Sequence, residues 1–105
     1  MPPIYKILTA EQWAEAQSAG HFAGSAADIR DGFIHFSTAE QVPDTLQKHF
    51  ANQPDLLLAE IDHDLVASSL KWEPSRNDQL FPHLYADLPL TAIKNIREIT
   101  PKDCV

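Results

Sequence analysis

The chain has 105 residues, 44% of them hydrophobic, which is enough for one globular domain (residues 1–105) with an apolar core. Its formal net charge of −7 argues against nucleic acid as the main partner, because phosphate binding requires clustered Lys and Arg, but it permits a small anionic ligand. The single cysteine, Cys104, excludes an internal disulfide and a cysteine-rich metal site. Without a signal-peptide pattern or a long apolar run, we expect a cytoplasmic protein with no membrane partner.

The first third of the chain predicts a strand followed by two helical segments. Residues 4–8 are rich in β-branched and aromatic side chains, which favour a strand. Thr9, followed three residues later by a glutamine, has capping-box spacing and predicts a helix over residues 10–19. Trp13 should anchor this helix in the core. A second cap spacing, at residues 25–28, predicts one short helical turn.

The next stretch carries the most informative polar residues. Residues 33–37 follow an Asp-Gly turn signal and predict a strand. Successive side chains of a strand alternate between faces, so Ile34 and Phe36 should point to the core. His35 and Ser37 should then share the opposite face, which solubility alone does not explain.

A polar corner is predicted after this strand. Thr38 and Gln41 have capping-box spacing, but Pro43 indicates that they form a turn, with the helix proper over residues 43–51. Polar groups at a strand end beside a helix start commonly hold an anion or an amide. The alternative is that His35 is a structural core histidine and Thr38 only a cap.

The second half predicts further strands and loops. The aliphatic run at residues 56–61 is typical of a central strand buried on both faces. Asp62 and the two polar residues after it could suggest a metal site, but an N-cap for a short turn is favoured. Strands or extended segments are predicted at residues 70–73, 81–85 and 93–99.

Together these elements predict an α+β domain, in which a mixed or antiparallel sheet packs against two main helices. Several side chains should share one core: Trp13, Phe36, Leu46, Phe50 and Leu58.

A scattered polar set remains, each member at a strand end or in an ordered loop, where sites tend to lie. Its members are Lys6, His35, Ser37, Thr38, Gln41, Glu73, Arg76, His83 and Tyr85. The sequence has no Gly-rich phosphate loop and no paired His on a helix, so we expect no metal. At least four of six residues should line one cleft: Lys6, His35, Thr38, Glu73, His83 and Tyr85.

Several stretches resemble the bacterial family called domain of unknown function 952, and the resemblance covers nearly the whole chain. They are residues 4–8, 31–41, 70–73, 80–85 and 89–90. Two motifs are specific to the family, namely Gly32 to Thr38 with Gln41, and Phe81 to Tyr85. This resemblance gives a fold context but no activity.

More distantly, the family resembles a minimal ADP-ribosyltransferase fold, which implies NAD or a related nucleotide as cofactor. In that fold a first strand grips the nicotinamide-side ribose, a second strand and its helix form the nicotinamide pocket, and a later Glu orients the sugar. The resemblance places residues 4–9 and 32–50 at the first two elements and Glu73 at the third, with Glu60 as a competitor. It departs at Lys6, where many relatives have His, because Lys is a flexible cation rather than an oriented ring.

The resemblance also implies roles. Glu73 and His35 would be catalytic, with Glu73 stabilising an oxocarbenium-like sugar. The ligand-binding candidates are Lys6, Ser37, Thr38, Gln41, Arg76, His83 and Tyr85. The alternative for Glu73 is a surface ion pair with Lys71 or Arg76.

Three functional hypotheses follow from these residues and resemblances. The first is a small enzyme that transfers ADP-ribose or cleaves a glycosidic bond. The second is a module that binds a small anionic or nucleotide ligand without chemistry. The third is a protein-interaction domain or toxin–antitoxin component whose polar cluster is structural. In each case we expect a monomer or a weak homodimer.

Overall fold

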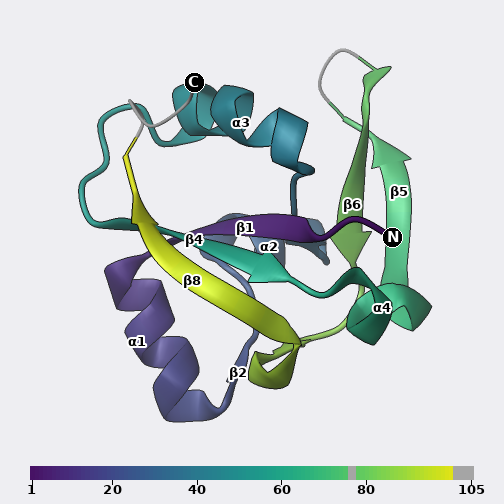
Figure 1. Cartoon of the computed structure of the whole chain (residues 1–105), viewed down its shortest axis with the longest axis horizontal. Coiled ribbons are helices and arrows are strands. Elements are labelled where there is room, and N and C mark those ends of the chain that lie inside the picture. Colours follow the sequence, from purple (N-terminus) through teal and green to yellow (C-terminus); the bar gives the residue numbers. More distant parts are fainter. Residues whose placement is uncertain (76–77, 101–105) are drawn as a thin grey trace.

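A computed structural model of the chain describes residues 1–75 and 78–100, and Arg76 and Cys104 lie outside these ranges. Its strands are β1 (Ile4–Thr9), β2 (His21–Phe22), β3 (Ile34–His35), β4 (Leu56–Ile61), β5 (Leu70–Pro74), β6 (Leu80–Leu84), β7 (Leu88–Pro89) and β8 (Ile93–Ile99). Its α-helices are α1 (Ala10–Ala19), α2 (Ala26–Asp31), α3 (Val42–His49) and α4 (His63–Val66). The fold is α+β with antiparallel sheets, which confirms the predicted class (Figure 1).

The first sheet has the order β1-β4-β8. β1 and β4 pair along their whole length, from Ile4 opposite Ile61 to Thr9 opposite Leu56. β8 pairs with the other edge of β4, starting with Ile99 opposite Leu56. The aliphatic strand therefore lies at the centre of its sheet, as the sequence predicted.

The second sheet has the order β3-β6-β5 and meets the first at one point of the described chain. Tyr5 and Ser37 each donate a backbone N–H to the carbonyl of the other, at 2.8 and 2.9 Å. Beyond this bridge β1 and β3 are not paired, so the two sheets separate.

The predicted strand at residues 33–37 is shorter in the structure, where β3 contains Ile34 and His35. The Phe36 N–H donates to the Pro82 carbonyl at 3.0 Å, but proline has no N–H to return the bond. The regular ladder therefore ends at Phe36. The predicted faces are confirmed, since Ile34 and Phe36 are both buried in the core.

The capping box predicted at Thr9 precedes α1, and a second one at Thr38 precedes a short 3-10 helix (Ala39–Gln41) that leads into α3, where the sequence predicted a turn. The Thr9 hydroxyl accepts the Gln12 N–H and the Gln12 side chain accepts the Thr9 N–H, both at 3.0 Å. Thr38 and Gln41 form the same reciprocal pair at 3.0 and 3.3 Å before α3, which has Pro43 in its first turn. Within the described residues no helix is long and apolar enough to cross a membrane.

The first sheet is covered on both faces, and this divides the core. One cluster, which includes Leu8 and Phe36, involves α1 and the second sheet. The other cluster lies under α3 and includes Ile7, Leu58 and Leu46. Ile7 and Leu8, which are neighbours in β1, thus belong to different clusters, because strand side chains alternate between faces.

The prediction of one shared core is therefore wrong. Phe36 belongs to the first cluster, and Trp13 is a partly buried side chain packed against it. Leu46 and Leu58 belong to the second cluster, and Phe50 packs against that one. A strand buried on both faces must supply two cores, and the sequence did not show which helix covers which face.

Replacing either capping threonine with alanine, Thr9→Ala or Thr38→Ala, should lower the free energy of unfolding by about 1 kcal/mol, because an orphan N–H at the helix start loses its acceptor. Urea denaturation measures both. The two variants are matched controls for each other, and a much larger cost for Thr38→Ala would show a role beyond capping.

Candidate functional site

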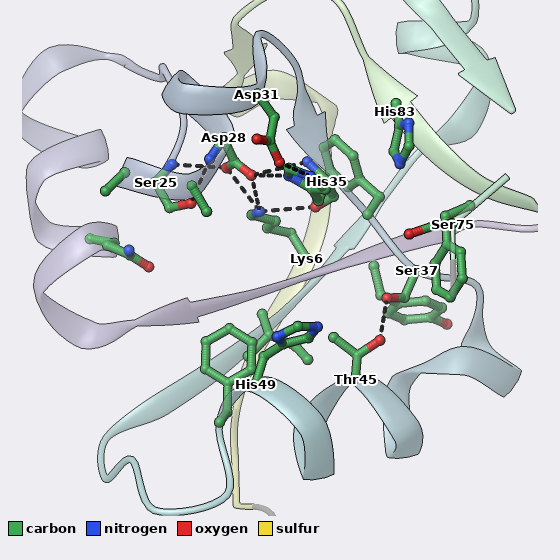
Figure 2. A pocket seen from close by; sticks show the side chains of 18 of the residues that line it. Lys6, Ser25, Asp28, Asp31, His35, Ser37, Thr45, His49, Ser75 and His83 are labelled. Carbon is green, nitrogen blue, oxygen red and sulfur yellow. Dashed lines mark hydrogen bonds and ion pairs between the residues drawn. The ribbon is translucent and has the colours of Figure 1, made fainter. Parts of the chain in front are cut away.

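A cavity of about 600 Å³ opens where the two sheets separate (Figure 2). β1 runs along it, and α2 with β3 contributes Asp28 and His35 on one side. On the opposite side α3 contributes Thr45 and His49. The volume lies within the range of pockets that enclose small organic ligands and cofactors.

The Asp28 carboxylate is the centre of the first wall. Its side chain is 2% exposed and receives the Lys6 ammonium at 2.9 and 3.2 Å. It also accepts the backbone N–H of Ser25 at 2.8 Å and that of His35 at 3.1 Å. One buried carboxylate therefore ties α2 to both β1 and β3.

Two carboxylates hold His35. Its Nδ1 lies 2.6 Å from Asp28 Oδ1, and its Nε2 lies 3.0 Å from Asp31 Oδ2. The ionised Asp28 carboxylate only accepts hydrogen bonds, so Nδ1 carries the proton of that bond, while Nε2 faces the Asp31 carboxylate in an ion-pair contact. Lys6 Nζ also donates to the His35 carbonyl at 2.9 Å.

Burial and ion pairing act against each other in this cluster. Burial raises the pKa of Asp28, but the hydrogen bond from His35 and the Lys6 ammonium outweigh it and hold that pKa well below its usual range. Burial lowers the pKa of Lys6, and the Asp28 carboxylate opposes this change. The hydrogen bond from Arg30, assisted by His35, lowers the pKa of the more exposed Asp31.

A separate carboxylate holds His83. His83 Nδ1 lies 2.8 Å from Glu73 Oε1, and the Tyr85 hydroxyl donates to the same oxygen at 2.7 Å. These hydrogen bonds, that of Tyr85 first, lower the pKa of Glu73, and the bond to Glu73 raises the pKa of Tyr85. Phe33 stacks on the His83 ring with centroids 4.1 Å apart, and the His35 centroid is 5.4 Å from that of His83.

The structure brings part of the predicted polar set together. Its members that line the cavity are Lys6, His35, Ser37 and His83. Glu73 and Tyr85 do not line it; Glu73 bonds His83 instead, and the Tyr85 hydroxyl donates to Glu73. Of the six residues expected in one cleft, only Lys6, His35 and His83 line the cavity, so the expectation of at least four is wrong.

Other members of the set have structural roles. Thr38 and Gln41 cap the short 3-10 helix (Ala39–Gln41) that leads into α3, and Gln41 Nε2 donates to the Leu80 carbonyl at 2.9 Å. Neither residue lines the cavity. Glu60, the competitor of Glu73, lies 3.8 Å from the Lys94 ammonium and does not line the cavity.

The alternative pairing of Glu73 with Lys71 is also corrected. The Lys71 ammonium lies over the Tyr85 ring, 4.8 Å from its centroid, while Glu73 bonds His83 and Tyr85. Near α4, Asp62 accepts the Asp64 N–H at 3.0 Å and is the predicted N-cap. In the described ranges no three His, Cys, Asp or Glu side chains are arranged to hold a metal ion.

Sequence reasoning missed Asp28, Asp31 and Thr45. The capping-box spacing of Ser25 and Asp28 was recognised, but not the second role of the carboxylate. The available signal was Lys6, which alternates with two buried aliphatic residues of β1. A charged side chain on an inward face requires a partner. Thr45 contacts a predicted residue, because its hydroxyl lies 3.1 Å from that of Ser37.

Comparison with known proteins identifies relatives. The profile of the family described as "Protein of unknown function (DUF952)" matches residues 7–96. The fold is similar to the X-ray structure of protein CC0527 from Caulobacter crescentus, with a TM-score of 0.88 and 41% identity over 90% of this chain and 83% of that one. The solution NMR structure of CC0527 gives a TM-score of 0.84 and 40% identity over 95% and 86% of the two chains. A comparison with curated proteins finds no match.

Replacing Asp28 with Asn should lower the free energy of unfolding by about 3–5 kcal/mol, because Lys6 and His35 would keep their charges without the buried carboxylate. Chemical denaturation measures the loss. Asp31→Asn is the matched control, because it removes a more exposed carboxylate from the same ring and should cost far less. Equal costs for the two variants would contradict the central position of Asp28.

The depressed pKa of Asp28 predicts an acid-sensitive fold. The folded pKa lies below the unfolded value of about 3.9, so the stabilisation is complete above roughly pH 5 and is lost as the pH falls through 3.9 toward the folded value. Urea denaturation between pH 5 and pH 3 should show this loss. The free energy of unfolding should depend less steeply on pH in Asp28→Asn. An unchanged slope would show that other carboxylates cause the loss of stability in acid.

Proposed function

Because the chain belongs to the DUF952 family, whose description names no activity, we propose its function from the cavity: it binds a nucleotide of NAD type and acts on the glycosidic bond between nicotinamide and ribose. The observation that carries this proposal is the position of the cavity. It lies in the split between two antiparallel sheets, beside the first strand and the strand–turn–helix segment of residues 33–49. The ADP-ribosyltransferase-like resemblance assigns these same two segments to the nicotinamide end of NAD.

The open edge of β1 supports an amide-bearing ligand. Tyr5 directs its N–H and C=O toward Ser37, and alternate residues of an antiparallel strand direct these groups to the same side. Ile7, which lines the cavity, therefore directs its N–H and C=O away from β4 and into the split. A donor and an acceptor on one residue can pair with both groups of a carboxamide such as that of nicotinamide.

His35 supports an anionic ligand. The charge of Lys6 is matched by buried Asp28, and Nε2 of His35 faces Asp31, which is about one-third exposed. A phosphate oxygen can take the place of the Asp31 carboxylate at Nε2 and gain a charge-assisted hydrogen bond. This offers local attraction for an anion in a chain of net charge −7.

The second candidate is binding without chemistry, and one observation favours it. The resemblance assigns the sugar contacts to Lys6 and Glu73, yet both side chains form hydrogen bonds to other residues of the protein. Lys6 holds Asp28 and the His35 carbonyl, and Glu73 holds His83 and Tyr85 from outside the cavity. Under this alternative the cavity senses the nucleotide and leaves it intact.

NAD should stabilise the protein against thermal unfolding, and ADP-ribose and nicotinamide, each containing part of it, should do so more weakly. A ligand present at 100 times its dissociation constant adds about 2.7 kcal/mol of stability, which a thermal-shift assay detects. Chromatography of the same mixtures should show nicotinamide released from NAD.

The variant His35→Gln keeps an amide donor for Asp28 but loses the ring nitrogen Nε2 that would bind a phosphate oxygen, so NAD affinity should fall about tenfold or more. Thr38→Ala is the control and should bind as the wild type does. Binding without nicotinamide release would select the second candidate. No stabilisation by any of the three ligands would contradict both.

A further inference from the structure

Glu73 and Tyr85 lie outside the cavity, yet Glu73 joins Tyr85 to His83, which lines it. The Tyr85 hydroxyl and His83 Nδ1 meet at one oxygen of Glu73, at 2.7 and 2.8 Å. Because an ionised carboxylate only accepts hydrogen bonds, Nδ1 must carry the proton of this bond. The neutral His83 ring therefore has Nε2 as its acceptor nitrogen.

The surroundings fix the His83 ring and direct it to the cavity. Phe33 covers one face of the ring at an interplanar angle of 23°, and the backbone of His83 pairs with Lys71 of β5 and His35 of β3. Its side chain is 5% exposed and forms part of the cavity wall (Figure 2). Among the described residues, Nε2 makes no hydrogen bond to another side chain.

The neighbouring histidine is unsuited to accept a proton. His35 donates through Nδ1 to Asp28, and its Nε2 faces the Asp31 carboxylate at 3.0 Å, so a carboxylate lies at each ring nitrogen. His83 has a single carboxylate partner in the described chain and keeps one acceptor nitrogen. The two rings, 5.4 Å apart, thus differ in their proton chemistry because of the number of carboxylates that hold them.

We propose that His83 is the general base of this cavity, acting on a water molecule, and that Glu73 and Tyr85 are positioning residues for it. This inference rests on the proposed action on NAD and identifies water as the acceptor. The water oxygen bonds to ribose C1′ while the bond from C1′ to the nicotinamide nitrogen breaks. That electron pair leaves with neutral nicotinamide, the water proton passes to Nε2, and ADP-ribose is the second product.

The charges of the supporting groups agree with this role. The lowered pKa of Glu73 keeps it a carboxylate at neutral pH, and the raised pKa of Tyr85 keeps its hydroxyl a donor. A carboxylate at Nδ1 stabilises the imidazolium that forms when Nε2 takes a proton. Under this proposal Glu73 acts through His83 and not by contact with the sugar, a role different from the catalytic one that the resemblance implies.

The first test uses the ligand-free protein and does not depend on NAD. Long-range proton–nitrogen NMR spectra of nitrogen-15-labelled histidine report which ring nitrogen is protonated. Above its titration, wild-type His83 should be the Nδ1–H tautomer, and Glu73→Ala should shift it toward Nε2–H. Glu60→Ala, which removes a partly exposed strand glutamate away from the cavity, should leave the tautomer unchanged. An Nε2–H tautomer in the wild type, or no change in Glu73→Ala, would overturn the positioning role.

The second test measures nicotinamide release from NAD. His83→Gln should lower kcat by about 10²–10⁴-fold, the usual effect of losing a general base. Glu73→Ala and Tyr85→Phe should lower kcat by less and leave KM near the wild-type value, while Glu60→Ala should change neither.

The two tests separate the two proposals. An unchanged kcat in His83→Gln, in a protein that still binds NAD, would overturn the general base alone. NAD binding by a wild type that releases no nicotinamide would also overturn the general base but would keep the binding function. Absence of NAD binding would overturn the proposed function, while the NMR result would still decide the positioning by Glu73.

Discussion

The buried carboxylate of Asp28 is the interaction on which the rest of the site depends. A carboxylate that is 2% exposed requires several partners, because water no longer solvates it. Its partners come from three segments: the Lys6 ammonium from β1, the Ser25 N–H at the start of α2, and both the ring and the backbone of His35. The sheets separate where Lys6 donates to the His35 carbonyl, so this charge cluster holds the cavity wall in place of a backbone ladder.

Local signals in the sequence predicted the elements well but not their long-range partners. The capping box at Thr9 and the proline at Pro43 predicted where the two long helices begin, and alternation predicted which side of the strand Ile34 and Phe36 face. These signals act within four residues, whereas Asp28 and Lys6 are 22 residues apart. A capping carboxylate is already satisfied in its own turn, so its sequence gives no sign of a second partner.

The candidate site shows the same limit. His35 and Ser37 were predicted on one face and both line the cavity, because the period of a strand fixes its faces. Glu73 and Tyr85 were assigned to the ligand from the resemblance and from their place at strand ends, but Glu73 bonds His83 and the Tyr85 hydroxyl bonds Glu73. Spacing along the chain cannot distinguish a side chain that lines a cavity from one that supports the lining.

The cavity wall contains two histidines that differ in the number of carboxylates at their ring nitrogens. This difference gives the two rings different chemical roles. A ring with a carboxylate at each nitrogen has no position left to accept a proton from water. A ring held at one nitrogen keeps a lone pair and suits proton transfer. The Lys6 ammonium matches the charge of Asp28 within the buried cluster, and the more exposed Asp31 faces Nε2 of His35. The same ion pair that replaces a stretch of backbone pairing therefore also leaves Nε2 of His35 facing the more exposed of the two carboxylates.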